Sequence, residues 1–456
     1  MQTQIFMVHK RHLGLRAPTV LAVGFALTIL VGALVLMLPV SAADGQITPF
    51  LDALFTAASA SCVTGLVTVS TAVHWSVFGK CVILLLIQIG GLGFMSVAAI
   101  ASFVLRRTIT LHERMVMSAG LNLSDGGGIV RLTRRVLFGT FIIEGAGAIL
   151  LSCRFVPHYG FPKGITMGVF HAVSAFCNAG FDLMGTPDDP FQSLIGWAED
   201  PLVNITVMAL IVLGGLGFFV WSDVWDKHSF RRLSLHTKIV LTATAGLLLF
   251  GFGWTLLFEW SNPATLGAFD TPHKLLAAAF ESVTLRTAGF NTIDLGALTG
   301  PSQAVSCLLM FIGGSPGSTA GGIKTVTAAV LVLTAISAFC GRTTVSAFGR
   351  TIAPRSIMNA VALLMAGGVF CLVGACAIAG IEDAPFYQCL FEAVSAFGTV
   401  GVSMGLTPTL AAASRVILIV MMYMGRVGVL TLGVAVFMRR REPARLKYPD
   451  ADVFIG

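Results

Sequence analysis

The sequence predicts an all-α polytopic membrane protein in which four span–pore helix–span repeats surround one central pore with pseudo-fourfold symmetry. Hydrophobic residues make up 55% of the 456-residue chain and charged residues 11%, whereas charged residues make up about 25% of an ordinary globular domain. A soluble fold of this length cannot bury so much apolar surface, but a bilayer can. The same glycine-centred turn also occurs four times, with central glycines at Gly65, Gly180, Gly289 and Gly401.

The spacing of these turns indicates an internal repeat. Successive central glycines lie 115, 109 and 112 residues apart, and near-equal spacing of one pattern over a whole chain is typical of repeated structural units. We therefore divide the chain into repeats of residues 1–105, 106–225, 226–340 and 341–456. The turns are residues 62–66 (CVTGL), 177–181 (CNAGF), 286–291 (RTAGFN) and 398–402 (GTVGV).

Long apolar stretches predict two membrane spans in each repeat. Residues 17–40 are long enough to cross a hydrocarbon core of about 30 Å. A cleavable signal peptide is the alternative, because Ser41 and two alanines follow this stretch, but its apolar region would exceed the usual length of about 7–15 residues. The other predicted spans are residues 78–104, 133–153, 202–222, 237–258, 303–336 (interrupted), 357–380 and 414–437.

A shorter apolar segment lies between the two spans of each repeat. The four segments are too short to cross the membrane, and each ends at a glycine turn, which indicates re-entrant half-helices. Three of them have a proline near the start, at Pro49, Pro272 and Pro385, where a missing N–H group costs nothing. The segments are residues 49–61, 166–177, 272–285 and 385–397.

The distribution of basic residues predicts the orientation. If the amino terminus is cytoplasmic, 21 of the 29 Lys and Arg residues fall on one side, in the two tails and the three loops between repeats. This asymmetry places both termini in the cytoplasm and explains the net charge of +7 without nucleic-acid binding. The opposite side receives six basic residues, Arg286 among them, and fourteen acidic ones, so a negative outer mouth would attract cations.

Four re-entrant turns predict a cation filter. Non-helical backbone is tolerated at membrane depth only where it is buried in protein or lines water, so the four turns should face one axis. Rings of backbone carbonyls replace the water around a monovalent cation, and glycine allows the positive φ that such a turn requires. Potassium channels use two glycines in each TVGYG loop, but each loop here keeps one filter glycine. We expect a shorter filter that selects potassium over sodium less strictly.

A second glycine cluster follows in each repeat, within the span after the half-helix. In the first two repeats we interpret residues 89–93 (IGGLG) and 213–217 (LGGLG) as sites of close helix packing through small residues. In the third, Pro316 and five glycines within residues 313–322 will not hold a continuous helix. We expect these residues to form a flexible loop at mid-membrane, below the filter.

The fourth cluster, residues 424–428 (MGRVG), places Arg426 where the other repeats have glycine. An arginine inside a span is costly and needs a partner, and the hydroxyl and carbonyl groups of the 313–322 loop are the expected partners. Its positive charge would oppose the passage of cations, so loop and arginine together form a predicted gate. Lys324 is interpreted as a structural or interfacial charge.

Two enzyme-like patterns in this loop are interpreted as coincidences. Residues 313–317 fit G-x-S-x-G, but that motif needs a strand–turn–helix and a histidine base, and His171 is better explained as a packing residue of the second half-helix. Residues 317–325 resemble a P-loop with Lys324 one place too late. The nine cysteines form no CxxC and indicate neither disulfides nor zinc. The sequence therefore predicts no enzyme.

At these residues the chain resembles the Trk/Ktr/HKT superfamily of potassium-uptake proteins. The resemblance covers about residues 17–440, and its most specific segments are residues 62–66, 286–291 and 313–325. The Ktr-type (KtrB-like) membrane subunit is most similar, because the chain starts directly at the first span of the first repeat.

The resemblance also assigns roles to residues. It implies that K⁺ binds at the filter residues Val63, Thr64, Gly65, Asn178, Ala179, Gly180, Thr287, Ala288, Gly289, Thr399, Val400 and Gly401. It implies gating by Gly313, Gly314, Ser315, Pro316, Gly317, Ser318, Thr319, Ala320, Gly321, Gly322 and Arg426.

The function and partners implied by the resemblance are those of a transport system. They are potassium uptake driven by membrane potential, a homodimer with one pore per protomer, and a cytoplasmic ring of nucleotide-binding (RCK/KTN-type) subunits. The expected location is the bacterial plasma membrane, in contact with lipids. No covalently bound cofactor is expected, and nucleotide would act only through the partner. Na⁺ is an activator in parts of the family, but no residue here is assigned to it.

Two questions stay open at this point. An alternating-access K⁺ symporter coupled to Na⁺ or H⁺ would also use broken helices at mid-membrane, although such folds usually contain inverted repeats and these four repeats run in the same sense. Glu144, within the predicted span 133–153, is either a satisfied buried acid or a functional one.

Overall fold

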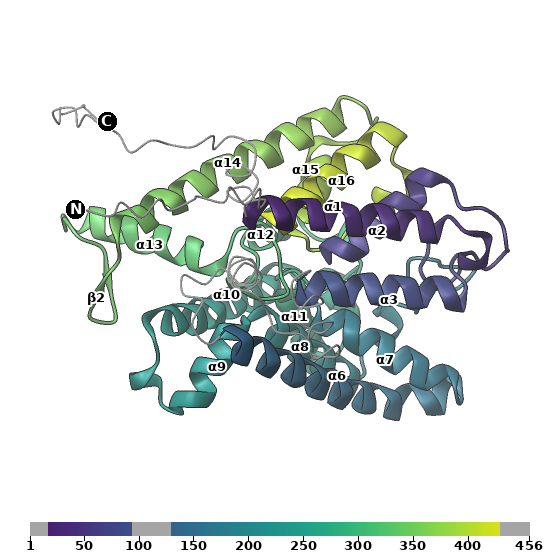
Figure 1. The fold of residues 1–456 in the computed structure, drawn as a ribbon, viewed down its shortest axis with the longest axis horizontal. Helices are drawn as coiled ribbons and strands as arrows, with labels where there is room; N and C mark the ends of the chain where they lie inside the picture. The colour runs from purple at the N-terminus through teal and green to yellow at the C-terminus, as the bar shows by residue number, and fades with distance from the viewer. Residues whose placement is uncertain (1–16, 94–128, 429–456) are drawn as a thin grey trace, which may run out of the picture.

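The structure, a computed structural model, describes residues 17–93 and 129–428 (Figure 1). Several sequence expectations lie outside the described residues: the two basic tails, most of the first inter-repeat loop, and the ends of the predicted spans 78–104 and 414–437.

The described chain forms four successive groups of helices. The first group contains α1 (Ala17–Leu36), α2 (Phe50–Cys62) and α3 (Val77–Leu92), and the second contains α6 (Ile129–Tyr159), α7 (Lys163–Phe176), α8 (Pro201–Gly215) and α9 (Phe218–Lys227). The third contains α10 (Leu235–Glu259), α11 (Thr271–Thr284), α12 (Gly300–Phe311) and α13 (Thr325–Phe339), and the fourth α14 (Pro354–Ala379), α15 (Phe386–Gly398) and α16 (Ala412–Val427). A two-stranded hairpin of β1 (Ser346–Ala347) and β2 (Arg350–Thr351) joins the third group to the fourth.

Four helices of the described chain are individually long and apolar enough to cross a membrane: α1, α6, α10 and α14. Apolar side chains on their outer faces are exposed; Ile142 on α6, for example, is 69% exposed. Such surface is unfavourable in water and favourable in lipid. Together with the composition, these helices identify the chain as a polytopic α-helical membrane protein, as the sequence predicts.

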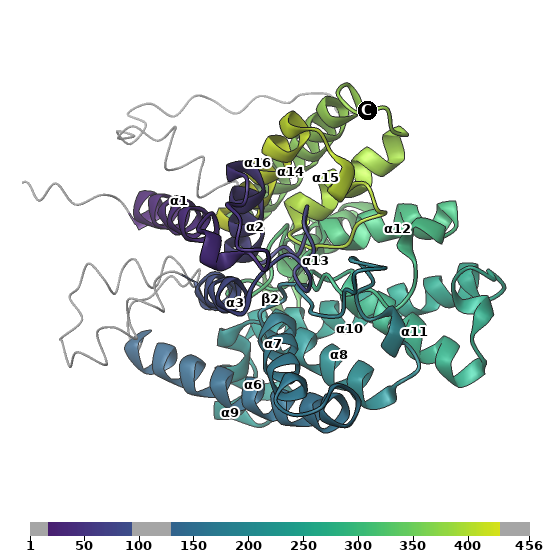
Figure 2. The same ribbon diagram turned by 90° about the vertical axis from the view of Figure 1, so that its right-hand side faces the viewer.

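The groups follow one another around a common centre. Figure 1 shows the axes of α1, α3, α6 and α14 lying roughly along the long dimension of the molecule, with α6 and α14 tilted away from each other. Figure 2 shows the first group at the left, the second below, the third at the right and the fourth at the top, in order around the centre. The carboxyl-terminal halves of the short helices α2, α7, α11 and α15 are largely buried. Each buries a phenylalanine at the corresponding place, at Phe55, Phe170, Phe280 and Phe391.

The four short helices match the predicted half-helices to within about three residues. The sequence features that start them are visible: Pro49 and Pro385 precede α2 and α15, and Pro272 lies in the first turn of α11. The Asp270 carboxylate caps α11 by accepting from the N–H group of His273. Such caps satisfy N–H groups that the helix itself leaves free.

The prediction of one straight span over residues 202–222 is wrong. The helix breaks at Gly217, whose φ is +96°, and α8 and α9 meet at a bend of 92°. In the first and fourth groups α3 and α16 end at glycines of the same cluster, Gly93 with φ +82° and Gly428 with φ +90°. A side chain makes such φ values unfavourable, so the last glycine in each of these three clusters lies where a helix ends or breaks.

The expected close packing is present at other glycines of these clusters. A Cβ atom added to Gly90 would overlap the carbonyl oxygen of Ser61, and one added to Gly214 would overlap that of Phe176. The clusters therefore do two things: their first glycines let the helix pack tightly behind the filter turns, and the last glycine stops the helix. The third span is interrupted, as predicted, between α12 and α13.

Candidate cation pathway

The four glycine turns meet in a closed ring at the centre of the molecule. Each filter glycine lies against a backbone carbonyl oxygen of the next group. That oxygen belongs to the residue just before the next filter glycine, and the glycine of the fourth group lies against the first group in the same way. A Cβ atom added to any of these glycines would collide with that oxygen. The pairs, with the Cβ-to-oxygen distance, are Gly65 with Ala179 (2.6 Å), Gly180 with Ala288 (2.8 Å), Gly289 with Val400 (2.8 Å) and Gly401 with Thr64 (an overlap).

The backbone of each turn alternates in handedness. The filter glycines have φ values of +98°, +69°, +84° and +92°, and the residues two places earlier have +57°, +58°, +68° and +52°. The residue between them is not in the positive-φ region, so successive carbonyl groups turn toward the same side of the chain. The residues two places before the glycines are Val63, Asn178, Thr287 and Thr399.

Sequence reasoning missed this second strained position. It assigned positive φ to glycine alone, yet three of the four residues involved are β-branched, and such residues rarely adopt this conformation. Strained backbone of this kind persists only where the surrounding structure imposes it, and it concentrates at functional sites. The strain therefore supports the assignment of the turns as the functional centre.

Hydroxyl groups of the short helices hold three of the turns. Ser59 Oγ accepts from the N–H group of Gly65 at 3.0 Å, and Ser395 Oγ accepts from that of Gly401 at 3.2 Å. In the third group Thr284 Oγ1 accepts from the N–H group of Phe290 at 3.1 Å and donates to its carbonyl at 2.6 Å. These hydroxyls were not among the predicted site residues. Their signal in the sequence is a Ser or Thr five or six places before each filter glycine.

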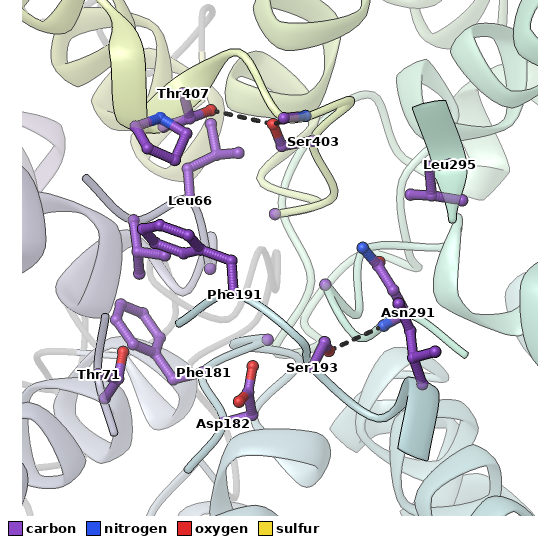
Figure 3. A pocket seen from close by; sticks show the side chains of 18 of the residues that line it. Leu66, Thr71, Phe181, Asp182, Phe191, Ser193, Asn291, Leu295, Ser403 and Thr407 are labelled. Atoms are coloured by element: carbon purple, nitrogen blue, oxygen red, sulfur yellow. Dashed lines mark hydrogen bonds between the residues drawn. The ribbon is translucent and has the colours of Figure 1, made fainter. Parts of the chain in front are cut away.

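A cavity of about 230 Å³ lies against the ring and is lined by all four filter glycines. Figure 3 shows this cavity, here called the vestibule, with the carboxylate of Asp182 pointing toward its centre and Asn291 and Ser403 on other sides. Asp294 also lines it. Burial raises the pKa of Asp182 to about 6, although the N–H group of Met184 donates to its carboxylate.

The predicted gating loop, residues 313–322, lies on the opposite side of the ring from the vestibule. Thr319 Oγ1 donates to Asn178 Oδ1 at 3.1 Å, and so the loop contacts the second filter turn directly. A Cβ atom added to Gly321 would overlap the side chain of Thr399 in the fourth turn. The N–H group of Ser315 donates to the carbonyl of Gly215 at 3.0 Å, which ties the loop to the end of α8.

Arg426 connects three parts of the structure. As expected from the sequence, its guanidinium donates to a loop carbonyl, that of Thr319. It also donates to the carbonyls of Gly90 and Gly91 on α3, which the sequence did not predict. Among the described residues no carboxylate forms an ion pair with Arg426. Within residues 17–93 and 129–428, the hydrogen-bond acceptors of Arg426 are therefore backbone carbonyl groups.

Arg286 was predicted on the outer side, and this is wrong. Its side chain is 7% exposed, and its Nη2 donates to the carbonyl of Gly313 and to Thr325 Oγ1, both at 3.0 Å. Gly313 is the first residue of the gating loop, and Thr325 begins α13 just after the loop. Counting charges by loop could not find this position, because Arg286 follows a half-helix that returns into the protein. Lys324 Nζ donates to the carbonyl of Ala320 at 2.6 Å, within the same region.

The short helices also support the segments that leave the filter. The Glu392 carboxylate accepts from Ser403 Oγ, from the N–H group of Met404 at 3.2 Å and from Thr407 Oγ1 at 2.6 Å. At the corresponding place in α11, both carboxylate oxygens of Glu281 are buried with no hydrogen-bond partner among the described residues. In α7 the place is taken by His171, whose Nε2 lies 3.3 Å from the nitrogen of Leu183.

Comparison with known proteins finds similarity to cation transport proteins. The family model described as TrkH, a cation transport protein, matches residues 10–443. The Ktr system potassium uptake protein B of Bacillus subtilis (strain 168) is 43% identical over 439 residues, which cover 96% of each chain. The potassium/sodium uptake protein NtpJ of Enterococcus hirae is 40% identical over 441 residues, again 96% of each.

Among solved structures, the potassium transporter TrkH from Vibrio parahaemolyticus has a similar fold. The TM-score is 0.71 at 17% sequence identity, and the likeness covers 94% of this chain and 86% of that one. At this identity the likeness concerns the fold alone.

Proposed function

The chain belongs to the TrkH family of cation transport proteins, and from this premise we propose that it takes up potassium across the bacterial plasma membrane through a gated, channel-like pore. In this proposal the four helix groups are the repeats predicted from the sequence. They surround one pore with approximate fourfold symmetry, and each contributes one glycine to the filter.

The observation that carries the proposal is the closed ring of filter glycines and carbonyl oxygens. A potassium ion that leaves water must exchange its hydration shell for other oxygens, and inward carbonyls supply them. The short helices point their carbonyl ends at the ring, which adds partial negative charge where the ion waits. Acidic residues of the vestibule raise the local concentration of cations at the entrance.

The gate lies on the inner side of the filter. The loop of residues 313–322 blocks the path below the ring, and Arg426 holds it through the carbonyl of Thr319. Opening requires Arg426 to release this carbonyl, so that the loop moves away from the second and fourth turns. Inward flow is then driven by the membrane potential, at about 2.3 kcal/mol per unit charge for each 100 mV.

Assembly and regulation follow the same premise. We propose a homodimer with a pore in each protomer, both termini in the cytoplasm, and a regulatory ring of RCK/KTN-type subunits on that face. Nucleotide acts through this ring, and the transporter itself holds no covalent cofactor. The relatives named as Ktr system proteins B and D support a multi-component system.

The experiment that tests the pore is concentrative uptake of tracer Rb⁺ into K⁺-loaded liposomes, with neither Na⁺ nor a pH gradient present. Outward leak of K⁺ through the reconstituted protein makes the interior negative, and a pore then accumulates Rb⁺. We expect uptake that stops when a second conductance collapses the potential. A lack of uptake under these conditions contradicts the pore.

The second candidate is an alternating-access K⁺ symporter coupled to Na⁺ or H⁺. The similarity to a protein named as a potassium/sodium uptake protein favours testing it. Coupled transport predicts that Rb⁺ uptake requires a Na⁺ or H⁺ gradient and that the two ions move in a fixed ratio. Simultaneous measurement of Rb⁺ and ²²Na⁺ fluxes distinguishes the two mechanisms.

A further inference from the structure

A second cavity lies away from the pathway, on the lipid side of the molecule. It measures about 470 Å³ and lies between α3, α6 and α7. Leu85, Phe141 and Val169 on its wall are 61%, 56% and 39% exposed, and so the cavity opens toward the bilayer. No residue lines both this cavity and the vestibule. Its volume is within the range of about 300–1,000 Å³ that is usual for small-molecule sites.

One carboxylate lies at the floor of this largely apolar cavity. Glu144, in the middle of α6, is 5% exposed and lines the cavity together with Gln88 of α3. Gln88 Nε2 donates to Glu144 Oε2 at 3.1 Å. Among the described residues Glu144 has no Lys, Arg or His as an ion-pair partner. A carboxylate at this depth is costly unless a cation or further donors satisfy it.

We propose that this cavity binds a lipophilic ammonium compound from the bilayer. The ammonium group donates to the free lone pairs of Glu144, and the hydrocarbon part packs on the apolar wall. Charge complementarity selects this occupant: an acyl chain alone would fill the wall and leave the carboxylate without a counter-charge. A lipid headgroup would have to leave the interface to reach it.

The cavity is connected to the second filter turn through one side chain. Cys177 Sγ lies 3.5 Å from Gln88 Oε1 and 3.8 Å from Glu144 Oε1, and the thiol is fully buried. Cys177 directly precedes Asn178, one of the strained residues of the filter. An occupant that pulls on Glu144 therefore acts on the filter, and we expect it to inhibit transport. This effect on flux, unlike the binding itself, rests on the proposed function.

Binding is tested separately from transport, with n-dodecylamine as the probe and n-dodecanol as the uncharged control of equal chain length. Cys81 is exposed and lines the cavity, so its alkylation by a maleimide reports occupancy. Replacement of the three other exposed cysteines by serine removes the background. These are Cys153, Cys340 and Cys376.

We expect dodecylamine to slow alkylation of Cys81 at concentrations where dodecanol does not. Glu144→Gln should weaken this protection about tenfold or more, because a charge-assisted hydrogen bond is lost, and Leu85→Trp should abolish it by filling the cavity. Equal protection by dodecanol, or unchanged protection in Glu144→Gln, overturns the proposal.

Transport is then measured as Rb⁺ uptake with and without dodecylamine. The ratio of the two rates in Glu144→Gln, compared with the same ratio in the unchanged protein, removes any general effect of the amine on the bilayer. Protection of Cys81 without inhibition contradicts the coupling to the filter and leaves the binding site standing. Loss of Rb⁺ uptake in all samples contradicts the proposed function alone.

Discussion

At the scale of single residues, the ring leaves no room for a side chain at a filter glycine. Gly401→Ala would place a Cβ atom on the carbonyl oxygen of Thr64, at a residue whose φ is +92°. We expect Rb⁺ uptake to fall at least about tenfold, because displacing one carbonyl disturbs the whole ring. Uptake into liposomes at matched protein amounts measures this loss.

The chain offers a matched control for that substitution. Gly405 has nearly the same φ, +90°, but a Cβ atom there meets nothing within 4 Å. Gly405→Ala therefore carries the backbone strain without the collision. If both variants lose uptake equally, strain in the segment and not crowding of the ring is the cause.

Arg426 is expected to hold the gate closed. Arg426→Ala removes both the charge and the bond to the carbonyl of Thr319, so basal Rb⁺ flux should rise several-fold. Arg415→Ala on the same helix is the control, because Arg415 pairs with Asp52 at 2.7 Å and does not touch the loop. A flux that stays unchanged or falls in well-folded Arg426→Ala protein argues against the barrier role.

Two glutamates at corresponding places should respond differently to the same change. Glu392 accepts three hydrogen bonds. In Glu392→Gln an amide NH₂ group replaces one accepting oxygen and faces a donor, so the free energy of unfolding should fall by about 1–3 kcal/mol. Glu281 accepts none from the described residues, so Glu281→Gln should be nearly neutral. Thermal unfolding in detergent compares the stability of the two variants. A larger loss of stability in Glu281→Gln than in Glu392→Gln would mean that the Glu281 carboxylate does accept a hydrogen bond.

At the scale of helices, the sequence predicted the short helices well and the helix ends poorly. The length and the nearby prolines of α2, α11 and α15 are local properties, and the predicted bounds match to within one residue. The break at Gly217 is different, since Gly-Gly-Leu-Gly is equally compatible with a packed helix. What decides the break is a contact with another group: a Cβ atom on Gly217 would lie 2.8 Å from the carbonyl oxygen of Pro316.

The filter backbone was predictable only where local sequence preference determines it. Spacing and composition indicated which glycines form the ring, because glycine is the residue expected at positive φ. They could not indicate that Val63 and Thr399 also adopt positive φ, since local preference opposes it. The roles of the filter residues in ion binding and of the loop in gating stay predictions.

The break between α8 and α9 gives a prediction at this scale. Gly217→Ala places a side chain at φ +96° against the carbonyl oxygen of Pro316, and we expect a loss of at least about 1 kcal/mol of stability. Gly246→Ala within α10, where a Cβ atom meets nothing, should be neutral or stabilising. The melting temperatures of the two purified variants test this prediction. Equal melting temperatures would mean that a side chain at residue 217 does not destabilise the bend.

At the scale of the whole molecule, counting charges suggested an orientation, which stays a prediction, and it misplaced Arg286. The count treats every residue outside a span as part of a loop in water. A half-helix violates this assumption, because the chain after it is still inside the protein. The same geometry brings residues of the segments after the filter turns to one entrance, where the acids Asp182 and Asp294 line a single vestibule.

The charge of that vestibule should make uptake depend on external pH. Burial raises the pKa of Asp182 to about 6, so the side chain is neutral at pH 5 and ionised at pH 7. Ionisation adds a negative charge at the entrance and raises the local concentration of cations. Rb⁺ uptake at subsaturating Rb⁺ should therefore increase between pH 5 and pH 7, and added inert salt should weaken the increase.

Asp182→Asn should remove this pH step and hold uptake at the low-pH level throughout. Asp294→Asn also removes a vestibule acid but leaves Asp182 in place, so uptake should fall while the step near pH 6 remains. A step that survives in Asp182→Asn assigns the titration to another group and separates the vestibule from the pH response. A step that disappears in Asp182→Asn alone places cation entry at the mouth formed by the segments that follow the four turns.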